Sequence, residues 1–96
     1  MAKFTVIHAE DNTAVALVDL SAGDTLEIAS AGKAVSVQLS DDIAFGHKFA
    51  VRDIAAGEKI TKYGETIGLA SVGIRAGQHV HIHNVDSVRA RGDLHK

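Results

Sequence analysis

Three histidines alternate with aliphatic residues near the end of the chain, in the order His79, Val80, His81, Ile82, His83. In an extended strand, side chains two residues apart point to the same face, so the three imidazoles would line one surface with their Cα atoms about 6.6 Å apart. Val80 and Ile82 would point to the opposite face and pack in a core. Because imidazole binds metal ions and exchanges protons near neutral pH, this pattern predicts a metal-binding or proton-transfer surface.

The same alternation has a simpler interpretation, in which the strand exposes a polar face and the histidines only contact water. A metal ion requires several neutral imidazoles or carboxylates that converge on one point. No further ligand in the sequence has a spacing that places it beside His79, His81 and His83. Any metal site on these three residues is therefore expected to be shared with a partner.

Two shorter motifs place further polar side chains next to a glycine. His47 and Lys48 follow a glycine and would offer a proton donor beside a fixed positive charge. Lys62 and Tyr63 precede a glycine and could hold a carboxylate or a sugar hydroxyl. Turns with exposed polar side chains are an alternative explanation of both motifs, with the Tyr63 ring covering the core and the Lys62 amine in water.

Composition excludes several classes of function. The formal net charge of -2 and the low aromatic content of 4% argue against a nucleic acid or an anionic membrane as partner. No apolar run approaches the ~20 residues that cross a bilayer, and the first residues resemble a strand rather than a signal peptide. The absence of cysteine excludes disulfides and thiolate chemistry. A soluble, cytoplasmic protein is expected.

Short alternating segments separated by glycine-centred turns dominate the chain and predict an all-β domain. The turn Ser30-Ala31-Gly32-Lys33 is expected to close a hairpin, and Ser40 could cap one helical turn. The expected strands cover residues 3–8, 14–18, 25–28, 34–39, 49–52, 58–62 and 78–85, with short pieces near Ile67 and Ile74.

One local pattern occurs three times, beginning at Leu20, Ile54 and Ile74. In each case an aliphatic residue, a spacer and Ala-Gly are followed by a polar residue, a second spacer and a further aliphatic residue. This order predicts a tight turn with glycine at positive φ and a strand leaving it. The unequal spacing indicates a corner that is used repeatedly rather than a solenoid repeat.

The length of 96 residues corresponds to one small domain. A domain of this size buries roughly 65% of its unfolded surface, which leaves little room for a deep pocket. We expect the domain to span residues 1–86. Residues 87–96 form a polar tail that is frayed or becomes ordered against a partner.

Taken together, the motifs resemble the small N-terminal module of the SAF type in altronate dehydratases and their relatives. The resemblance covers nearly the whole chain. It rests on the sequence segments Ile7-His8-Ala9-Glu10-Asp11-Asn12, Ala14-Val15-Ala16-Leu17, Gly46-His47-Lys48-Phe49-Ala50, Asp53-Ile54, Lys62-Tyr63-Gly64, Ile67-Gly68 and Gly77-Gln78-His79-Val80-His81-Ile82-His83-Asn84.

The resemblance implies a β-clip fold, built from many short bent strands. It also implies a hydro-lyase reaction in which D-altronate loses water to give 2-dehydro-3-deoxy-D-gluconate. Members of the family are described as dependent on iron or manganese, so Fe²⁺ or Mn²⁺ is the expected cofactor, bound mainly by the partner. The partner is a much larger catalytic domain or subunit, without which the small module is expected to be inactive.

Removal of water from such an acid requires a base for the α-proton, a cation for the developing charge and an acid for the leaving hydroxyl. The hypothesis for this chain gives His81, His83 and His47 catalytic roles. Metal ligation is assigned to His79, His81 and His83, and substrate binding to Lys48, Lys62 and Asn84.

Two other functions remain open from the sequence. Close relatives of the same type include the small subunit of sulfolactate sulfo-lyase, which also removes a group β to a carboxylate. A module without catalytic residues, which only binds a sugar acid or assembles subunits, is the alternative from another class. The sequence does not identify the sugar acid, and a homo-oligomer is compatible with either function.

Overall fold

The computed structural model describes residues 3–6, 11–30, 33–62, 64–81 and 83–86. The described residues form strands, bridges and turns and contain no helix, which confirms the prediction of an all-β domain. The strands are β1 (Phe4–Thr5), β2 (Thr13–Ala16), β3 (Thr25–Ser30), β4 (Lys33–Gln38), β5 (Lys48–Ala50), β6 (Lys59–Lys62), β7 (Glu65–Ala70), β8 (His79–Val80) and β9 (Val85–Asp86).

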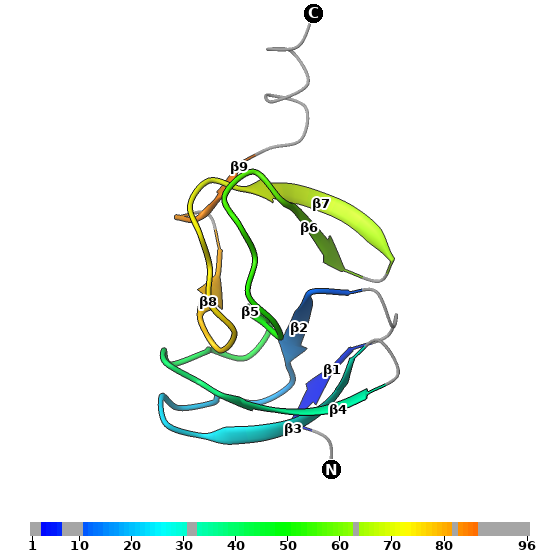
Figure 1. The fold of residues 1–96 in the computed structure, drawn as a ribbon. Coiled ribbons are helices and arrows are strands. Elements are labelled where there is room, and N and C mark those ends of the chain that lie inside the picture. The colour runs from blue at the N-terminus through cyan, green and yellow to red at the C-terminus, as the bar shows by residue number, and fades with distance from the viewer. Residues whose placement is uncertain (1–2, 7–10, 31–32, 63, 82, 87–96) are drawn as a thin grey trace, which may run out of the picture.

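Three small antiparallel sheets share these strands (Figure 1). The central sheet has the order β1-β2-β5-β8, the β3-β4 hairpin forms a second sheet, and β6, β7 and β9 form the third. In β3-β4, Ser30 pairs with Lys33, which confirms the predicted hairpin. The segment near Ile67 forms the full strand β7, whereas Ile74 forms only an isolated bridge with Ile54.

The repeated corner occurs four times, at residues 20–24, 43–47, 54–58 and 74–78. In each corner a backbone hydrogen bond closes a four-residue turn, with N···O distances of 2.9–3.0 Å. The glycine of each turn has a positive φ of 84–94°. The corner at 43–47 was missed in the sequence because Phe45 replaces the alanine of the Ala-Gly pair. The predicted helical turn after Ser40 is wrong, since Ile43 instead pairs with Leu20 across a β-bridge.

The four corners form two equivalent pairs. Leu20 bridges Ile43 in the first pair and Ile54 bridges Ile74 in the second. A β-hairpin joins the two corners of each pair, and a short strand leaves the second corner, β5 in one unit and β8 in the other. The chain therefore contains two similarly built units, a relation that the unequal spacing of the motifs concealed.

Strands β5 and β8 pair directly with each other. Lys48 pairs with Val80 and Phe49 with His79, in antiparallel register. The strands that follow the second and fourth corners are thus brought side by side.

Aspartates connect the corners of each pair. The Asp19 carboxylate accepts a hydrogen bond from the Phe45 amide at 2.9 Å, and Asp42 accepts one from Ala22 at 2.9 Å. In the second pair, Asp53 accepts from Ala76 at 2.9 Å. Each of these aspartates directly precedes a bridging aliphatic residue, and side chains of this type commonly stabilise turns by accepting from backbone amides.

The fourth equivalent position is Gly73, which cannot bind the amide of Ala56. Replacing Gly73 by aspartate is expected to raise the free energy of unfolding by about 0.5–1.5 kcal/mol through this additional hydrogen bond. A Cβ atom at Gly73 meets no other atom within 4 Å. Chemical denaturation measures the change. Gly73→Ala is the control for the reduced entropy of the unfolded chain, and equal stability of the two variants would contradict the proposed bond.

A buried polar segment connects the central sheet to the β6-β7 hairpin. Asn12 is 1% exposed and its side-chain oxygen accepts a hydrogen bond from the Thr61 amide at 2.8 Å. The Thr13 hydroxyl donates to the Thr61 carbonyl at 2.8 Å, and the buried Asp11 carboxylate accepts from the Gly64 amide at 2.8 Å. These bonds fix both ends of the turn that carries Lys62.

Two hydrophobic clusters form the core. The segment 78–85 supplies buried Val80 to the second cluster, whereas Ile82 and Tyr63 lie outside the described residues. The predicted tail, 87–96, also lies outside them. No helix in the described part of the chain is long and apolar enough to span a membrane. The first cluster comprises Ala14, Ala16, Leu20, Leu26, Ile28, Val37, Leu39, Ile43, Phe49 and Val51. The second cluster comprises Ala50, Ile54, Ile60, Ala70, Ile74 and Val80.

Candidate functional site

The histidine segment is not the continuous strand that its alternation predicts. Strand β8 ends at Val80, and the chain then turns, with the Asn84 amide donating to the His81 carbonyl at 3.1 Å. The prediction of one extended segment across residues 78–85 is therefore wrong. A local turn replaces the strand because a side chain within the segment offers the backbone an alternative set of hydrogen bonds.

That side chain belongs to Asn84, which is 5% exposed. Its Oδ1 atom accepts from the His81 amide at 2.9 Å, and its Nδ2 atom donates to the His79 carbonyl at 2.8 Å. Both polar atoms of the Asn84 side chain thus form hydrogen bonds with the backbone of the histidine segment. Asn84 therefore positions the backbone of His79 and His81, and its contact with substrate stays a prediction.

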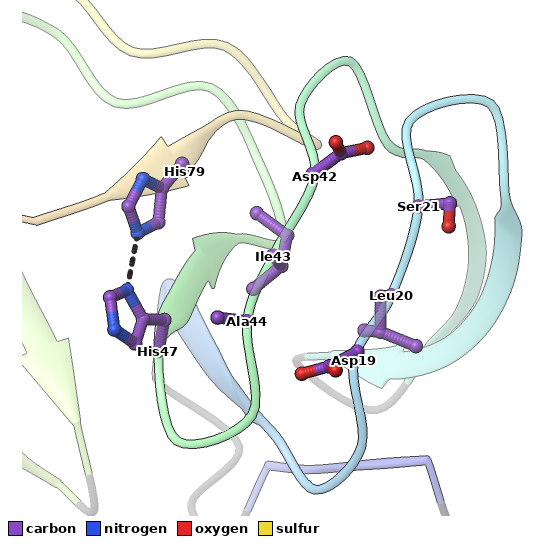
Figure 2. A pocket seen from close by; sticks show the side chains of 8 residues that line it. All are labelled: Asp19, Leu20, Ser21, Asp42, Ile43, Ala44, His47 and His79. Atoms are coloured by element: carbon purple, nitrogen blue, oxygen red, sulfur yellow. Dashed lines mark hydrogen bonds between the residues drawn. The ribbon is translucent and has the colours of Figure 1, made fainter.

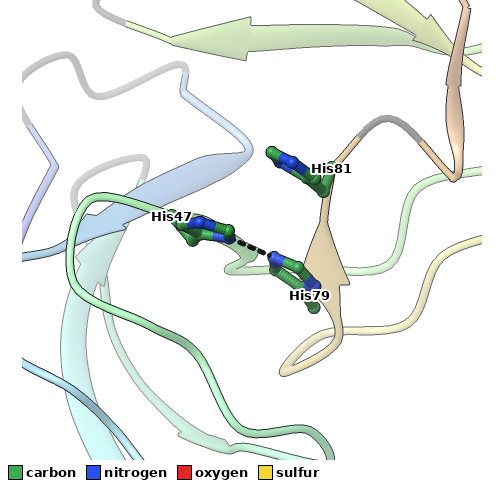
Figure 3. A group of neighbouring side chains, drawn as sticks. All are labelled: His47, His79 and His81. Atoms are coloured by element: carbon green, nitrogen blue, oxygen red, sulfur yellow. Dashed lines mark hydrogen bonds between the residues drawn. The ribbon is translucent and has the colours of Figure 1, made fainter.

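The turn brings together a histidine cluster that consists of His47, His79 and His81 (Figure 3). Each residue offers one ring nitrogen, and the three nitrogens lie within 4.8 Å of one another. His47 Nδ1 and His79 Nε2 are 2.9 Å apart, so one must donate a proton and the other accept it. The His81 ring stacks on both, with centroid distances of 4.6 Å to His47 and 5.3 Å to His79.

His47 reaches this cluster because of its place in the corner at 43–47. In the other three corners, the residue after the glycine binds the first amide of its own turn through its side chain. The bonds are Asp24 to Ser21, Glu58 to Ala55 and Gln78 to Arg75, at 2.7–2.9 Å. His47 stands at the same position but bonds instead to His79 on the neighbouring strand β8.

His83 lies at the edge of the cluster. Its ring is exposed and its centroid is 5.4 Å from that of His79, at an interplanar angle of 36°. It is not one of the three converging residues. The sequence therefore identified His79 and His81 as candidate ligands, but the third member of the converging set is His47, which had been expected only to transfer protons.

Electrostatics lower the pKa of one ring of the cluster. The pKa of His79 is lowered, first by burial, then by the neighbouring charges of His47, His81 and His83, while Asp41 partly opposes the shift. The Asp41 carboxylate also accepts a hydrogen bond from the His79 amide at 2.9 Å. Neutral imidazole is the form that binds a metal ion, so the arrangement favours ligation.

The three residues of the cluster could hold a divalent metal ion. Imidazole nitrogens bind such ions at about 2.1 Å, which places two nitrogens of one site roughly 3–4 Å apart. The nitrogens of the cluster lie within 4.8 Å of one another, which is close to that spacing. Three imidazoles on one side of an ion suit Fe²⁺ and other transition metals better than Mg²⁺ or Ca²⁺, and leave coordination positions for other groups.

A second feature adjoins the cluster through His81. A cavity of about 340 Å³ is lined by Lys48, Lys62, Ile67, His81 and Val85. Burial, and then the charge of Lys62, lower the pKa of Lys48. Two lysines on one small cavity provide a positive potential that favours an anion such as a carboxylate. The structure thus brings the two predicted substrate-binding lysines together.

A second hollow borders the cluster at His47 and His79 (Figure 2). It has a volume of about 420 Å³ and extends from these histidines to the first pair of corners. The Asp19 and Asp42 side chains line it, and both carboxylates accept hydrogen bonds from corner amides. The histidine cluster therefore borders both a lysine-lined cavity and an acidic hollow.

Comparison with known proteins identifies related sequences. A family model described as the altronate/galactarate dehydratase SAF domain matches residues 2–88. The altronate dehydratase of Escherichia coli (strain K12) is 48% identical over 82 residues, and that of Bacillus subtilis (strain 168) is 42% identical over 84 residues. The (2R)-sulfolactate sulfo-lyase subunit alpha of Chromohalobacter salexigens is 37% identical over 89 residues.

These relatives differ in how much of their own length is matched. The aligned residues make up 85% and 88% of this chain but only 16% of each altronate dehydratase. In contrast, they cover 90% of this chain and 95% of the sulfo-lyase subunit. The same domain thus occurs as a small part of a long enzyme and as nearly all of a short subunit. The all-β architecture agrees with the β-clip fold that the resemblance implied.

Proposed function

The chain belongs to the altronate/galactarate dehydratase SAF domain family, and on this basis we propose that it is the small domain or subunit of a sugar-acid dehydratase. The proposed reaction is the conversion of D-altronate to 2-dehydro-3-deoxy-D-gluconate, carried out with a larger catalytic partner. The observation that carries the proposal is the shared position of His81, which belongs to the histidine cluster and also lines the Lys48-Lys62 cavity.

The two lysines provide the binding step. A protonated amine forms a charge-assisted hydrogen bond with a carboxylate, which is stronger than a bond between neutral groups. Lys48 and Lys62 would hold the carboxylate of the sugar acid, and His81 lies at the same cavity, where the adjoining carbon atoms would be placed. The buried segment at Asp11 and Asn12 fixes the strand end that carries Lys62.

His47, His79 and His81 would hold Fe²⁺ or Mn²⁺, together with ligands from the partner. A divalent ion bound there would supply Lewis-acid stabilisation of the negative charge that develops next to the carboxylate. Asn84 keeps the backbone of His79 and His81 in place for this role. His83 is exposed beside the cluster and would carry the proton that the leaving hydroxyl requires, while the partner supplies the base.

One observation favours a second candidate. The sulfo-lyase subunit alpha of C. salexigens is matched over 95% of its length, so a relative of this size occurs as a separate subunit. The same lysine cavity could bind the carboxylate of sulfolactate. Under this alternative, the chain would be the small subunit of an enzyme that eliminates the sulfonate group of sulfolactate, whereas a dehydratase eliminates water.

Domain replacement in a known relative tests the proposal. A chimera in which this chain replaces the matched segment of E. coli altronate dehydratase is expected to retain turnover of altronate. In the chimera, Lys62→Met should raise KM for altronate about 10-fold, because one charge-assisted bond to the carboxylate is lost. Steady-state kinetics measure both effects.

Lys59→Met is the matched control, since Lys59 is exposed on the same strand β6 and does not line the cavity. Its KM should remain within about twofold of the unmodified chimera, as for most surface substitutions. An equal rise in KM for the two variants would contradict a specific role of Lys62. An inactive chimera, together with turnover of sulfolactate by this chain combined with a sulfo-lyase partner, would favour the second candidate.

A further inference from the structure

We propose that the corner at residues 43–47 is the place where this domain docks on its large catalytic partner, with Phe45 as the apolar anchor. This inference rests on the proposed function, because the partner is the remaining part of a dehydratase-type enzyme. It concerns a different surface from the lysine-lined cavity.

The comparison between corners shows that the fold does not require phenylalanine at this position. The residue before the turn glycine is Ala22, Ala56 and Ala76 in the other three corners, and Phe45 only here. The Phe45 amide is bound by the Asp19 carboxylate, as the Ala22 amide is bound by Asp42. The backbone roles are equivalent, so the aromatic ring is an addition to the corner rather than part of its construction.

The Phe45 side chain is 66% exposed. The other described aromatic residues pack inside the domain, with Phe4 and Phe49 in edge-to-face contact at a centroid distance of 6.1 Å. Leu17, which is 38% exposed, lies next to this corner because the preceding residue accepts a hydrogen bond from the Gly46 amide. A phenylalanine held on a rigid turn loses little conformational entropy on binding, and buried aromatic residues are typical anchors of protein interfaces.

Carboxylates outnumber basic side chains around Phe45, where Lys3 lies beside Leu17, and this excess defines the chemistry of the partner. Asp19, Asp41 and Asp42 are exposed close to this corner. The sequence from residue 13 to residue 47 contains a single lysine or arginine, Lys33, and five acidic residues: Asp19, Asp24, Glu27, Asp41 and Asp42. The partner surface that fits is therefore an apolar pocket bordered by lysine or arginine side chains.

The same corner also carries a member of the histidine cluster. His47 follows Phe45 by two residues and bonds to His79 at 2.9 Å. A partner seated on Phe45 would thus lie beside the histidine cluster, where additional metal ligands are needed. The altronate dehydratases, of which this domain matches 16%, contain ample further chain to supply such a surface.

Fluorine NMR on the chimera with E. coli altronate dehydratase tests the docking. p-Fluorophenylalanine is placed either at position 45 or at position 72, where Val72 is 53% exposed and serves as the matched control. A soluble paramagnetic agent then reports the solvent exposure of each probe in the chain alone and in the chimera. We expect the relaxation enhancement at position 45 to fall about fivefold or more in the chimera, since the centre of an interface excludes solvent, and the enhancement at position 72 to stay unchanged.

Three results would overturn the inference. The first is equal exposure of the position-45 probe in the chain alone and in the chimera. The second is equal protection at positions 45 and 72. The third is concentration-dependent protection at position 45 in the chain alone, which would make a second copy the occupant. The readout does not depend on turnover, so a protected probe in an inactive chimera would refute the proposed function but support the docking surface.

Discussion

Replacing His47 by glutamine is expected to weaken the binding of Mn²⁺ or Fe²⁺ by the isolated chain about 10-fold or more. Structural zinc sites provide about 10–16 kcal/mol, or about 3–4 kcal/mol for each of four ligands, and Mn²⁺ and Fe²⁺ bind the same ligands more weakly. Glutamine is chosen because Gln78 stands at the same position of another corner and binds its own turn amide at 2.7 Å. The variant should therefore keep the turn while it removes the ligand. Calorimetric titration, with Fe²⁺ under anaerobic conditions, measures the affinity.

The reciprocal variant Gln78→His is the control for the cluster. It alters the equivalent corner but leaves the three converging imidazoles intact, so its affinity should stay within about threefold of the original chain. Unchanged metal binding in His47→Gln would remove His47 from the ligand set. In the chimera, undiminished turnover after His81→Ala would exclude His81 from any catalytic role.

Replacing Gly77 by alanine is expected to cost about 3–5 kcal/mol of stability and to leave much of the chain unfolded. Gly77 has a φ of 92°, which is unfavourable for a residue with a side chain. In addition, the new Cβ atom would overlap the carbonyl oxygen of Gln38 and lie 3.2 Å from the Cα atom of Leu39. These are backbone atoms, so the contact cannot be relieved by a change of rotamer. Urea denaturation followed by circular dichroism measures the loss.

Gly57→Ala provides the matched control. Gly57 occupies the same position of a corner, with a φ of 86°, but a Cβ atom there meets nothing within 4 Å. Its cost should be limited to the strain of the backbone conformation, about 1–2 kcal/mol. Equal losses in the two variants would show that the contact between Gly77 and the end of β4 does not determine the stability of the domain.

Much of the fold could be predicted from local patterns. The alternation of Thr25 to Ile28, the hairpin at Ser30 and Lys33 and the glycine turns all report interactions between residues near in sequence, and the structure confirms them. The corner at Ile43 and the pairing of the two units were missed. Both depend on contacts between distant segments, such as the bridge between Leu20 and Ile43, which no local pattern reveals.

The candidate site was predicted in part. Alternation placed His79 and His81 together, and the structure keeps them together although the strand ends at Val80. His47 could not be recognised as the third converging residue, because it lies 32 positions from His79 and reaches it only through the pairing of β5 with β8. A comparison of the four corners could have identified His47. The residue after the turn glycine is Asp24, Glu58 or Gln78 in three corners and His47 in the fourth.

The division of the histidine cluster between the two units has a consequence for the order of events during synthesis. His47 belongs to the first unit, whereas His79 and His81 belong to the second, and β5 must pair with β8 before their nitrogens converge. A nascent chain released as far as residue 78 would hold only one of these ligands. Capture of an ion at the proposed site would therefore be a late step, which follows the pairing of the two units.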